Sequence, residues 1–226
     1  MSEAPAATRT VERALVLLAA VADHGGTLSA LARDAGLSPS TSSRLLATLA
    51  RHEFVRRDRS GRYSAGTRLR QLAAAALRDD PLYELSGPHL DALVAETGET
   101  ANLAVAAGED RIVYLRQVVS PQLVRTASWA GRTIPRLGTA LGAVLDGELG
   151  GDGYLARTGT VEPEVTSIAA PIRGPGEGIV AAISLLAPTY RTPERRVVNC
   201  GRLLTRHAAE LSRSLGSGAH DQEQAA

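Results

Sequence analysis

The spacing of apolar residues predicts two short helices near the start of the chain. The first helix carries apolar residues at i, i+3, i+4 and i+7, namely Leu28, Leu31, Ala32 and Ala35. Gly36 ends it, because glycine readily adopts the left-handed backbone of a helix exit. Ser38 and Pro39 then start a second helix as its N-cap and first-turn residue. Two short helices joined in this way predict a helix-turn-helix, whose second helix enters the major groove of DNA.

The second helix has one apolar side and one polar side. We expect Leu45, Leu46 and Leu49 to be buried, while Ser42 stands where such helices usually bury an apolar residue and is not expected to contact a base. Helix N-termini favour phosphate, and hydroxyl groups bind both phosphates and base edges. The candidate DNA-binding residues of this helix are therefore Ser38, Ser40, Thr41, Ser43 and Arg44.

An arginine-rich hairpin is predicted directly after this helix. Two short strands flank residues 58–61, which supply turn-forming side chains. Its arginines Arg57, Arg59 and Arg62 are expected to lie against the DNA backbone or the minor groove. Helix, turn, helix and basic hairpin in this order predict a winged helix-turn-helix DNA-binding domain over residues 8–66.

Two further helices flank this motif. Residues 11–23 form the third helix that a winged domain needs, with an expected buried face of Val11, Leu15, Leu18, Ala19 and Ala22. Residues 68–78 form another amphipathic helix, which we interpret as a linker helix over 67–80. On periodicity alone, a capping helix of the first domain is an equally good interpretation of that segment.

The pattern changes to mixed helix and strand from residue 81 to residue 216. We predict helices at 82–97, 138–146 and 193–215, strands at 101–107, 111–119 and 123–129, and a hairpin of 166–172 with 179–186. The turn of this hairpin is 173–178, whose glycines lie between strands and do not open a phosphate-binding helix. An antiparallel sheet with helices on one side is the expected architecture, so the fold class is α+β. Residues 217–226 are expected to be a flexible tail.

Composition narrows the possible functions. Residues 1–66 carry nine arginines against six acidic residues, whereas residues 67–226 carry sixteen against eighteen, so the basic excess lies in the proposed DNA-binding part. There is neither a long apolar span nor a signal-like start, so we expect a cytoplasmic protein that does not enter a membrane. One cysteine, Cys200, excludes an internal disulfide. The five histidines show no ligand spacing, so we expect no metal and no cofactor.

The ordered motifs resemble a known family. A winged helix is followed by TGETANLAV at 97–105, PRLGTALG at 135–142, SIAAPIRG at 167–174 and AAISLLAP at 181–188. Over residues 9–215 this order is similar to the IclR family of bacterial transcriptional regulators. The resemblance implies a GAF-like effector-binding and oligomerisation domain at 81–216, and a homodimer or a dimer of dimers. It also implies operator DNA as a partner, with affinity set by a small-molecule effector.

The resemblance also implies a pocket. Matched to the family's motifs, the effector-binding candidates are Thr139, Ala140, Leu141, Ser167 and Ser184. Equally, the two serines could satisfy backbone groups within their strands.

The chain departs from the family pattern at three places around that pocket. Leu137 replaces the usual histidine, the segment from 142 to 167 is a few dozen residues shorter, and Arg157 stands where some members carry an acid. An Arg157 that turns inward would favour a carboxylate or amino-acid-like effector. An outward, solvated Arg157 is the alternative, and a regulator that has lost its ligand response also remains open.

Two other classes of function are weighed against DNA binding. An enzyme on the C-terminal domain is one, but the sequence carries no nucleophile elbow, phosphate loop or metal-ligand motif, so no catalytic residue is expected. Cys200 lies on an amphipathic helix and is interpreted as a small buried apolar residue. A winged helix that only makes protein–protein contacts is the other class. Salt-dependent binding to promoter DNA separates these interpretations.

Overall fold

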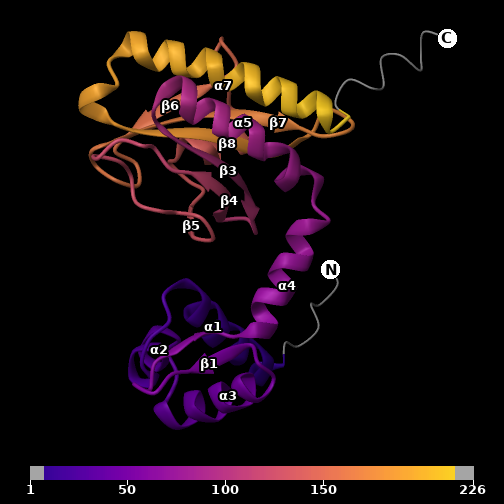
Figure 1. Cartoon of the computed structure of the whole chain (residues 1–226), viewed down its shortest axis with the longest axis vertical. Helices are drawn as coiled ribbons and strands as arrows, with labels where there is room; N and C mark the ends of the chain where they lie inside the picture. The colour runs from indigo at the N-terminus through magenta and orange to yellow at the C-terminus, as the bar shows by residue number, and fades with distance from the viewer. Residues whose placement is uncertain (1–7, 217–226) are drawn as a thin grey trace, which may run out of the picture. The chain divides into compact units, whose positions relative to one another are not determined.

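The computed structural model describes residues 8–216 and divides them into two compact units between Asp79 and Asp80 (Figure 1). The expected tail at 217–226 lies outside the described residues. Each unit has its own buried core.

The N-terminal unit is a small helical domain with a two-stranded hairpin. Its core contains one or two buried side chains from each of α1, α2, α3 and the hairpin: Leu17, Val21, Leu31, Leu46, Val55 and Tyr63. In chain order the elements are α1 (Arg9–Asp23), α2 (Leu28–Asp34), α3 (Pro39–Arg51), β1 (Val55–Arg57), β2 (Tyr63–Ala65) and α4 (Thr67–Arg78).

The turn between α2 and α3 has the predicted geometry. Gly36 has a φ of +64°, the left-handed backbone expected at the end of α2. Ser38 is the N-cap of α3, and its hydroxyl accepts a hydrogen bond from the Thr41 backbone N–H at 3.2 Å. The helix-turn-helix prediction is therefore confirmed at the level of individual caps.

The predicted buried face of α1 is wrong except at Leu18, which is partly buried against the core. The helix buries Leu17 and Val21, whereas the side chains of Val11 and Leu15 are 54% and 58% exposed. The reason lies in the sequence of α1, which is apolar over most of its circumference between residues 14 and 22. Periodicity then offers two apolar faces, and tertiary packing selects between them.

The helix α4 leaves the hairpin of the N-terminal unit without joining its core. None of its residues is buried, and Leu72 is 43% exposed. Its first turn is tied to the end of the α3–β1 connection, where the Arg68 backbone N–H donates to the Glu53 carbonyl at 3.0 Å. This helix is therefore fixed at its start and exposed along its length.

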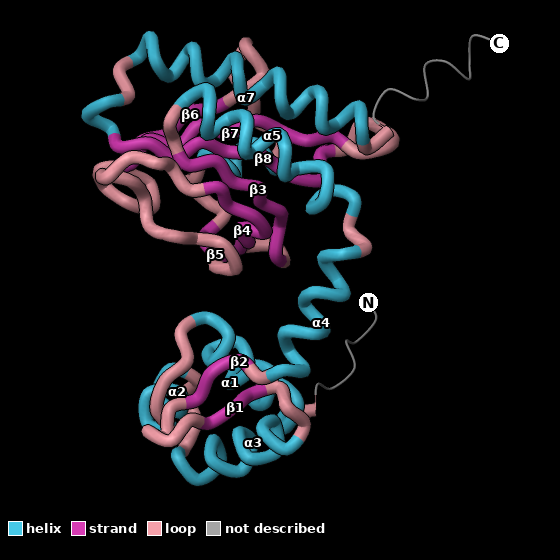
Figure 2. The backbone as a smooth tube through the Cα atoms, viewed as in Figure 1, coloured by secondary structure: helices cyan, strands magenta, loops and turns pink. Residues whose placement is uncertain are grey.

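The C-terminal unit is built on a six-stranded antiparallel sheet with the strand order β5-β4-β3-β8-β7-β6 (Figure 2). Asp80 caps the first helix by accepting from the Leu82 and Tyr83 backbone N–H groups. The elements are α5 (Pro81–Thr97), β3 (Thr100–Ala107), β4 (Arg111–Val118), β5 (Thr133–Pro135), α6 (Ala140–Leu145), β6 (Leu155–Thr158), β7 (Val165–Arg173), β8 (Ile179–Pro188), a 3₁₀ turn (Thr189–Arg191) and α7 (Glu194–Ser214).

Helices cover both faces of this sheet, so the expectation of helices on one side is wrong. The helices α5 and α7 pack side by side on one face (Figure 1), over Leu103, Ile168 and Ile183. On the other face α6 packs against Ala104 and Ile112. This explains why β3, β7 and β8 are nearly continuous apolar runs, because strands buried on both faces lose the alternation of a half-exposed sheet.

The strand predicted at 123–129 is also wrong. Leu123 is 98% exposed and the segment from 119 to 132 is a loop, whereas β4 pairs with Thr133–Pro135 and sets Ile112 opposite Ile134. Ile134 is 2% exposed in the core of the α6 face, where Trp129 of the preceding loop packs beside it. The edge strand β6 was not predicted, because its four residues show no apolar alternation.

Candidate DNA interface and ligand pocket

The exposed side of α3 carries most of the predicted DNA-binding residues. Ser40, Ser43 and Arg44 are exposed, and Thr41 is half-buried. Within residues 8–216 the guanidinium of Arg44 has no carboxylate partner, so it is free to bind an anion. On the buried side Leu46 is 0% exposed, with Leu45 and Leu49 partly buried, as predicted.

Hydroxyl groups gather at the N-terminus of α3. The Ser38 hydroxyl donates to Thr41 Oγ1 at 2.9 Å and lies 3.2 Å from Ser40 Oγ. This cap orders the first turn, where backbone N–H groups favour a phosphate. Ser42, by contrast, is 0% exposed and its hydroxyl has no partner among the described residues, so it takes no part in this surface.

An open groove runs between α1 and α3 and brings in residues that the sequence pattern did not indicate. Thr10 and Arg13 of α1 line this groove together with Thr41, Arg44 and Thr48 of α3. Arg13 precedes the buried Leu17 by one helical turn. Had the sequence predicted the buried face of α1 correctly, it would have placed Arg13 on the groove side as a second cation beside Arg44.

The hairpin β1–β2 forms the predicted wing, and its arginines are not equivalent. Arg59 and Arg62 are exposed at the turn. The guanidinium of Arg57 instead lies 5.5 Å from the centroid of the Tyr63 ring, and its Nε donates to the Gly61 carbonyl at 3.4 Å. Arg57 therefore stiffens the wing, while Arg59 and Arg62 extend from its tip.

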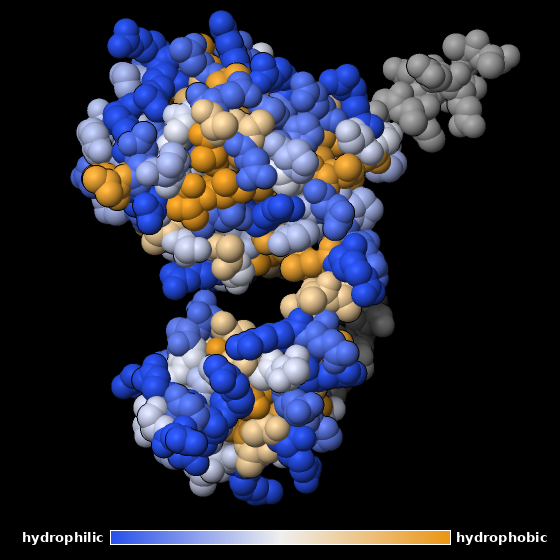
Figure 3. Space-filling model, in the orientation of Figure 1, coloured by the Kyte–Doolittle hydropathy of each residue, from blue (hydrophilic) through white to orange (hydrophobic). Residues whose placement is uncertain are grey.

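Asp58 organises the wing turn. Its carboxylate accepts from the Ser60 hydroxyl at 2.7 Å and from the Arg62 backbone N–H at 2.9 Å. The Ser60 hydrogen bond, followed by that from Arg62, lowers the pKa of this carboxyl group. These hydrogen bonds give the wing tip a fixed shape. The surface around it is polar: in the view of Figure 3 most of the N-terminal unit is hydrophilic.

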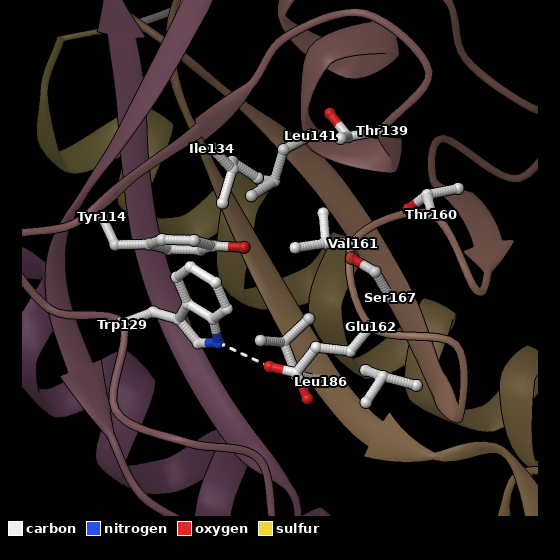
Figure 4. Close-up of a pocket in the computed structure, with 11 residues that line it drawn as sticks. Tyr114, Trp129, Ile134, Thr139, Leu141, Thr160, Val161, Glu162, Ser167 and Leu186 are labelled. Atoms are coloured by element: carbon white, nitrogen blue, oxygen red, sulfur yellow. Dashed lines mark hydrogen bonds between the residues drawn. The ribbon is translucent and has the colours of Figure 1, made fainter.

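A pocket opens on the α6 face of the sheet in the C-terminal unit (Figure 4). Its empty volume is about 380 Å³, mouth included. Polar groups come from Thr139, Thr160, Glu162 and Ser167. The apolar walls are Tyr114, Trp129, Ile134, Leu141, Val161, Val165 and Leu186.

Two loops meet across this pocket through one hydrogen bond. The Trp129 indole Nε1–H donates to Glu162 Oε1 at 2.9 Å, joining the 119–132 loop to the β6–β7 loop (Figure 4). Burial, with a smaller contribution from the Glu162 charge, raises the pKa of Tyr114, so its phenol stays protonated as a donor. The pocket therefore combines aromatic walls with one carboxylate and one phenol.

Three of the residues implied by the family resemblance line this pocket, namely Thr139, Leu141 and Ser167. The Thr139 hydroxyl is already engaged, because it caps α6 by accepting from the Gly142 backbone N–H at 3.0 Å and donates to the Arg136 carbonyl. Ala140 is 0% exposed and packs in the core beneath α6, so it does not face the pocket.

Ser184 lies beside the pocket in a small buried polar cluster. Asn102 of β3 is in register with Ser184 of β8 and with Gln117 of β4, so the three side chains leave the same face of the sheet. Among the described residues, the Ser184 hydroxyl, both amide atoms of Asn102 and Gln117 Nε2 have no hydrogen-bond partner. Buried polar atoms of this kind require a water molecule or a ligand group.

The positions where the chain departs from the family pattern lie at the margins of this site. Arg157 of β6 is in register with Ser167, and its guanidinium makes a single 3.4 Å contact with Glu148, which is 64% exposed. Its side chain is 33% exposed and lies outside the pocket lining. Leu137, at the position of the family's usual histidine, is 93% exposed and does not line the pocket.

No helix among residues 8–216 is long and apolar enough to cross a membrane. Cys200 is 5% exposed on α7, and burial raises the pKa of its thiol, in keeping with an unreactive core residue.

Comparison with protein families gives matches in both units. A model of the IclR helix-turn-helix domain matches residues 10–59, and a model of the bacterial transcriptional regulator IclR C-terminal region matches residues 74–147. The chain is 25% identical over 250 aligned positions to the HTH-type transcriptional repressor AllR of Escherichia coli K12, covering 94% of this chain and 92% of that protein. Because 250 positions exceed the 226 residues of the chain, AllR contains segments that are absent here.

Further similarities come from a second repressor and from solved structures. The acetate operon repressor of Salmonella typhimurium is 33% identical over 131 residues, which cover 56% of this chain and 48% of that protein. An IclR transcriptional regulator from Alicyclobacillus acidocaldarius has a TM-score of 0.78 at 25% identity, covering 92% of this chain and 98% of that one. An IclR homologue from Microbacterium hydrocarbonoxydans, complexed with 4-hydroxybenzoate, has a TM-score of 0.74 at 20% identity, covering 92% and 100%.

Proposed function

Because the chain belongs to the IclR family of DNA-binding transcriptional regulators, we propose that it is a repressor whose operator affinity is set by a small molecule bound in the C-terminal unit. Its site of action is the cytoplasm, where bacterial DNA lies, and it has no catalytic role. The observation that carries the DNA-binding part is the unpaired Arg44 on the exposed face of α3, beside the ordered N-terminal turn of that helix. The names of AllR and the acetate operon repressor support repression.

In this proposal α3 reads bases and the wing holds phosphates. Ser40, Ser43 and Arg44 face outward on one side of α3, the arrangement of a recognition helix in the major groove. Arg59 and Arg62 at the wing tip would contact phosphates or the minor groove. Arg57 would act indirectly, since its guanidinium already stacks on Tyr63.

We further propose that two chains bind one operator. A single winged domain contacts few phosphates, and symmetric half-sites double both the contacts and the specificity. The exposed apolar side chains Val11 and Leu15 on α1 support this, because they offer an unfilled apolar face to a second copy. A dimer of dimers would follow if the C-terminal units also associate.

Arg44→Ala should weaken binding to the operator by about 1–3 kcal/mol and relax the sequence preference, because it removes a bidentate contact to a base. Arg59→Ala should weaken all sequences alike and reduce the slope of log affinity against log salt by about one. The measurement is fluorescence anisotropy on DNA mapped by footprinting upstream of the protein's own gene, with a titration to establish two chains per operator. Arg33→Ala, an exposed arginine of α2, is the matched control. Equal affinity of the Arg44 variant and the wild type would remove α3 from the interface.

For the effector, we propose an amino-acid-like molecule with an apolar body. Glu162 lines the pocket and suits an amine, whereas Arg157 lies one strand away beside Ser167 and suits a carboxylate. The weak contact of Arg157 with an exposed Glu148 is readily exchanged for a ligand carboxylate. The relative that binds 4-hydroxybenzoate supports a ring-sized apolar body.

Calorimetric titration with three compounds tests the roles of Glu162 and Arg157 separately. Phenylalanine carries both an amine and a carboxylate, phenethylamine only the amine, and 3-phenylpropanoate only the carboxylate. Phenylalanine should bind roughly tenfold or more tightly than either partner compound, because it satisfies both side chains with charge-assisted hydrogen bonds. Glu162→Gln should abolish the preference for the amine, and Arg157→Gln the preference for the carboxylate. Glu164→Gln, on an exposed neighbour, should change neither. If 3-phenylpropanoate binds the wild type as well as phenylalanine does, Glu162 does not select the effector. If nothing binds or changes operator affinity, the ligand response has been lost.

A further inference from the structure

The helices α5 and α7 carry a second cluster of chemically active side chains, on the opposite face of the sheet from the ligand pocket. His89 of α5 and His207 of α7 are 118 residues apart in sequence, yet their Nδ1 atoms lie 3.0 Å from each other. Glu210, one helical turn after His207, places a carboxylate oxygen 3.9 Å from His89 Nδ1. The three ligand atoms all lie within 4.8 Å of one another.

We propose that His89, His207 and Glu210 form a binding site for one Zn²⁺ ion that joins α5 to α7. Two imidazoles and one carboxylate are a common zinc ligand set, with the fourth position left for water. Ligand atoms about 2.0–2.1 Å from a tetrahedral ion are separated from each other by about 3.4 Å. The observed separations of 3.0 and 3.9 Å bracket that value, so small side-chain rotations close the site.

The surroundings of His207 orient it for this role. Its Nε2 lies 3.2 Å from Glu96 Oε1, so an Nε2–H that donates to this carboxylate leaves the Nδ1 lone pair directed at the proposed ion. The Glu96 carboxylate in turn accepts hydrogen bonds from Arg206 Nη2, which lies 2.9 Å from each of its two oxygens. The Arg206 guanidinium neutralises Glu96, so the negative charge of Glu210 is left to balance the proposed ion.

The two ring nitrogens that face each other can be joined by a proton or by an ion. Without an ion, one of the two facing Nδ1 atoms must carry the proton, and His89 then donates to His207. With an ion bound, both Nδ1 atoms act as ligands and both rings carry their proton on Nε2. The side chains are 19% exposed for His89, 7% for His207 and 41% for Glu210, so the site is enclosed on the helix side and open to solvent at the carboxylate.

The test is calorimetric titration of the full chain, first treated with EDTA, with ZnCl₂. We expect one ion per chain at this site and a higher melting temperature with zinc than with EDTA. His89→Gln and Glu210→Gln should each weaken binding about tenfold or more. Because Glu210 is partly exposed, its variant should fold even if His89→Gln does not. The melting temperature of each variant in EDTA shows whether it folds without zinc.

Controls separate this site from other zinc ligands in the chain. His24→Gln, in the N-terminal unit, and Cys200→Ser, on α7, should leave the affinity unchanged. Nitrogen-15 NMR of the imidazole rings should show Nδ1 coordination of both histidines when zinc is present. Zinc binding that survives in both the His89 and Glu210 variants, or its absence in the wild type, would overturn the proposal.

Discussion

Glu99→Leu should destabilise the C-terminal unit by about 3–5 kcal/mol and lower its melting temperature by roughly 10 °C. The Glu99 side chain is 1% exposed and accepts from Arg191 Nε at 2.8 Å and Arg191 Nη2 at 2.7 Å. A third hydrogen bond comes from Arg196 Nη2 at 3.0 Å. Leucine fills a similar volume but accepts nothing, so two guanidinium groups that the fold places against the carboxylate lose their counter-charge.

The effect should be large because this cluster joins three parts of the unit. Arg191 also donates to the Val124 carbonyl in the 119–132 loop, and Arg196 donates to the Thr97 carbonyl at the end of α5. Removing Glu99 therefore loosens a loop that carries Trp129 of the ligand pocket. Ligand binding should weaken together with stability.

Chemical unfolding followed by circular dichroism measures this change. Glu109→Leu, on an exposed glutamate, is the control and should stay within about 0.5 kcal/mol of the wild type. The double variant Glu99→Leu/Arg191→Leu should cost less than the sum of the single variants, because each single change leaves an unpaired charge. Strict additivity would mean that Glu99 and Arg191 do not stabilise the fold as a pair.

The helix-turn-helix was predictable because its signals are local. The period of Leu28 and Leu31, the exit at Gly36 and the cap at Ser38 all depend on residues within one or two turns of each other. The hairpin after α3 was predictable for the same reason. The role of Arg57 was not, because its stacking on Tyr63 depends on the register of the two strands.

The errors arise where the sequence offers alternatives that only tertiary packing decides. Two apolar faces compete on α1, and the structure buries the one that contains Leu17. The 123–129 segment has the composition of a strand, but the edge of β4 is occupied by Thr133–Pro135. Local periodicity contains no information on either choice.

The sites of the C-terminal unit depend on contacts between distant segments. Family resemblance indicated Thr139 and Ser167, since both lie within recognisable motifs. It did not indicate the bond between Trp129 and Glu162, which lie 33 residues apart in two loops. The pairing of His89 with His207 could not be predicted from the sequence either. The two residues are 118 positions apart and meet only because α5 packs against α7.

In the Leu46→Ala variant, operator binding should be lost on heating at a temperature roughly 8–40 °C below that of the wild type. The side chain is 0% exposed in the centre of the N-terminal core, and deleting it costs about 2–5 kcal/mol through lost burial and the remaining cavity. A domain of this size has a stability of only several kcal/mol, so this is a large share of it. Each kcal/mol shifts the melting temperature of such a domain by about 4–8 °C.

The same variant tests whether the two units fold independently. Differential scanning calorimetry should show the transition of the N-terminal unit moved down, with that of the C-terminal unit unchanged, because their cores share no residue. Leu137→Ala, at a leucine that is 93% exposed, should move neither transition. A shift of both transitions in Leu46→Ala would show that the units unfold together. Loss of operator binding in Leu46→Ala without a change in either transition would mean instead that Leu46 contributes to the DNA interface rather than to the core beneath it.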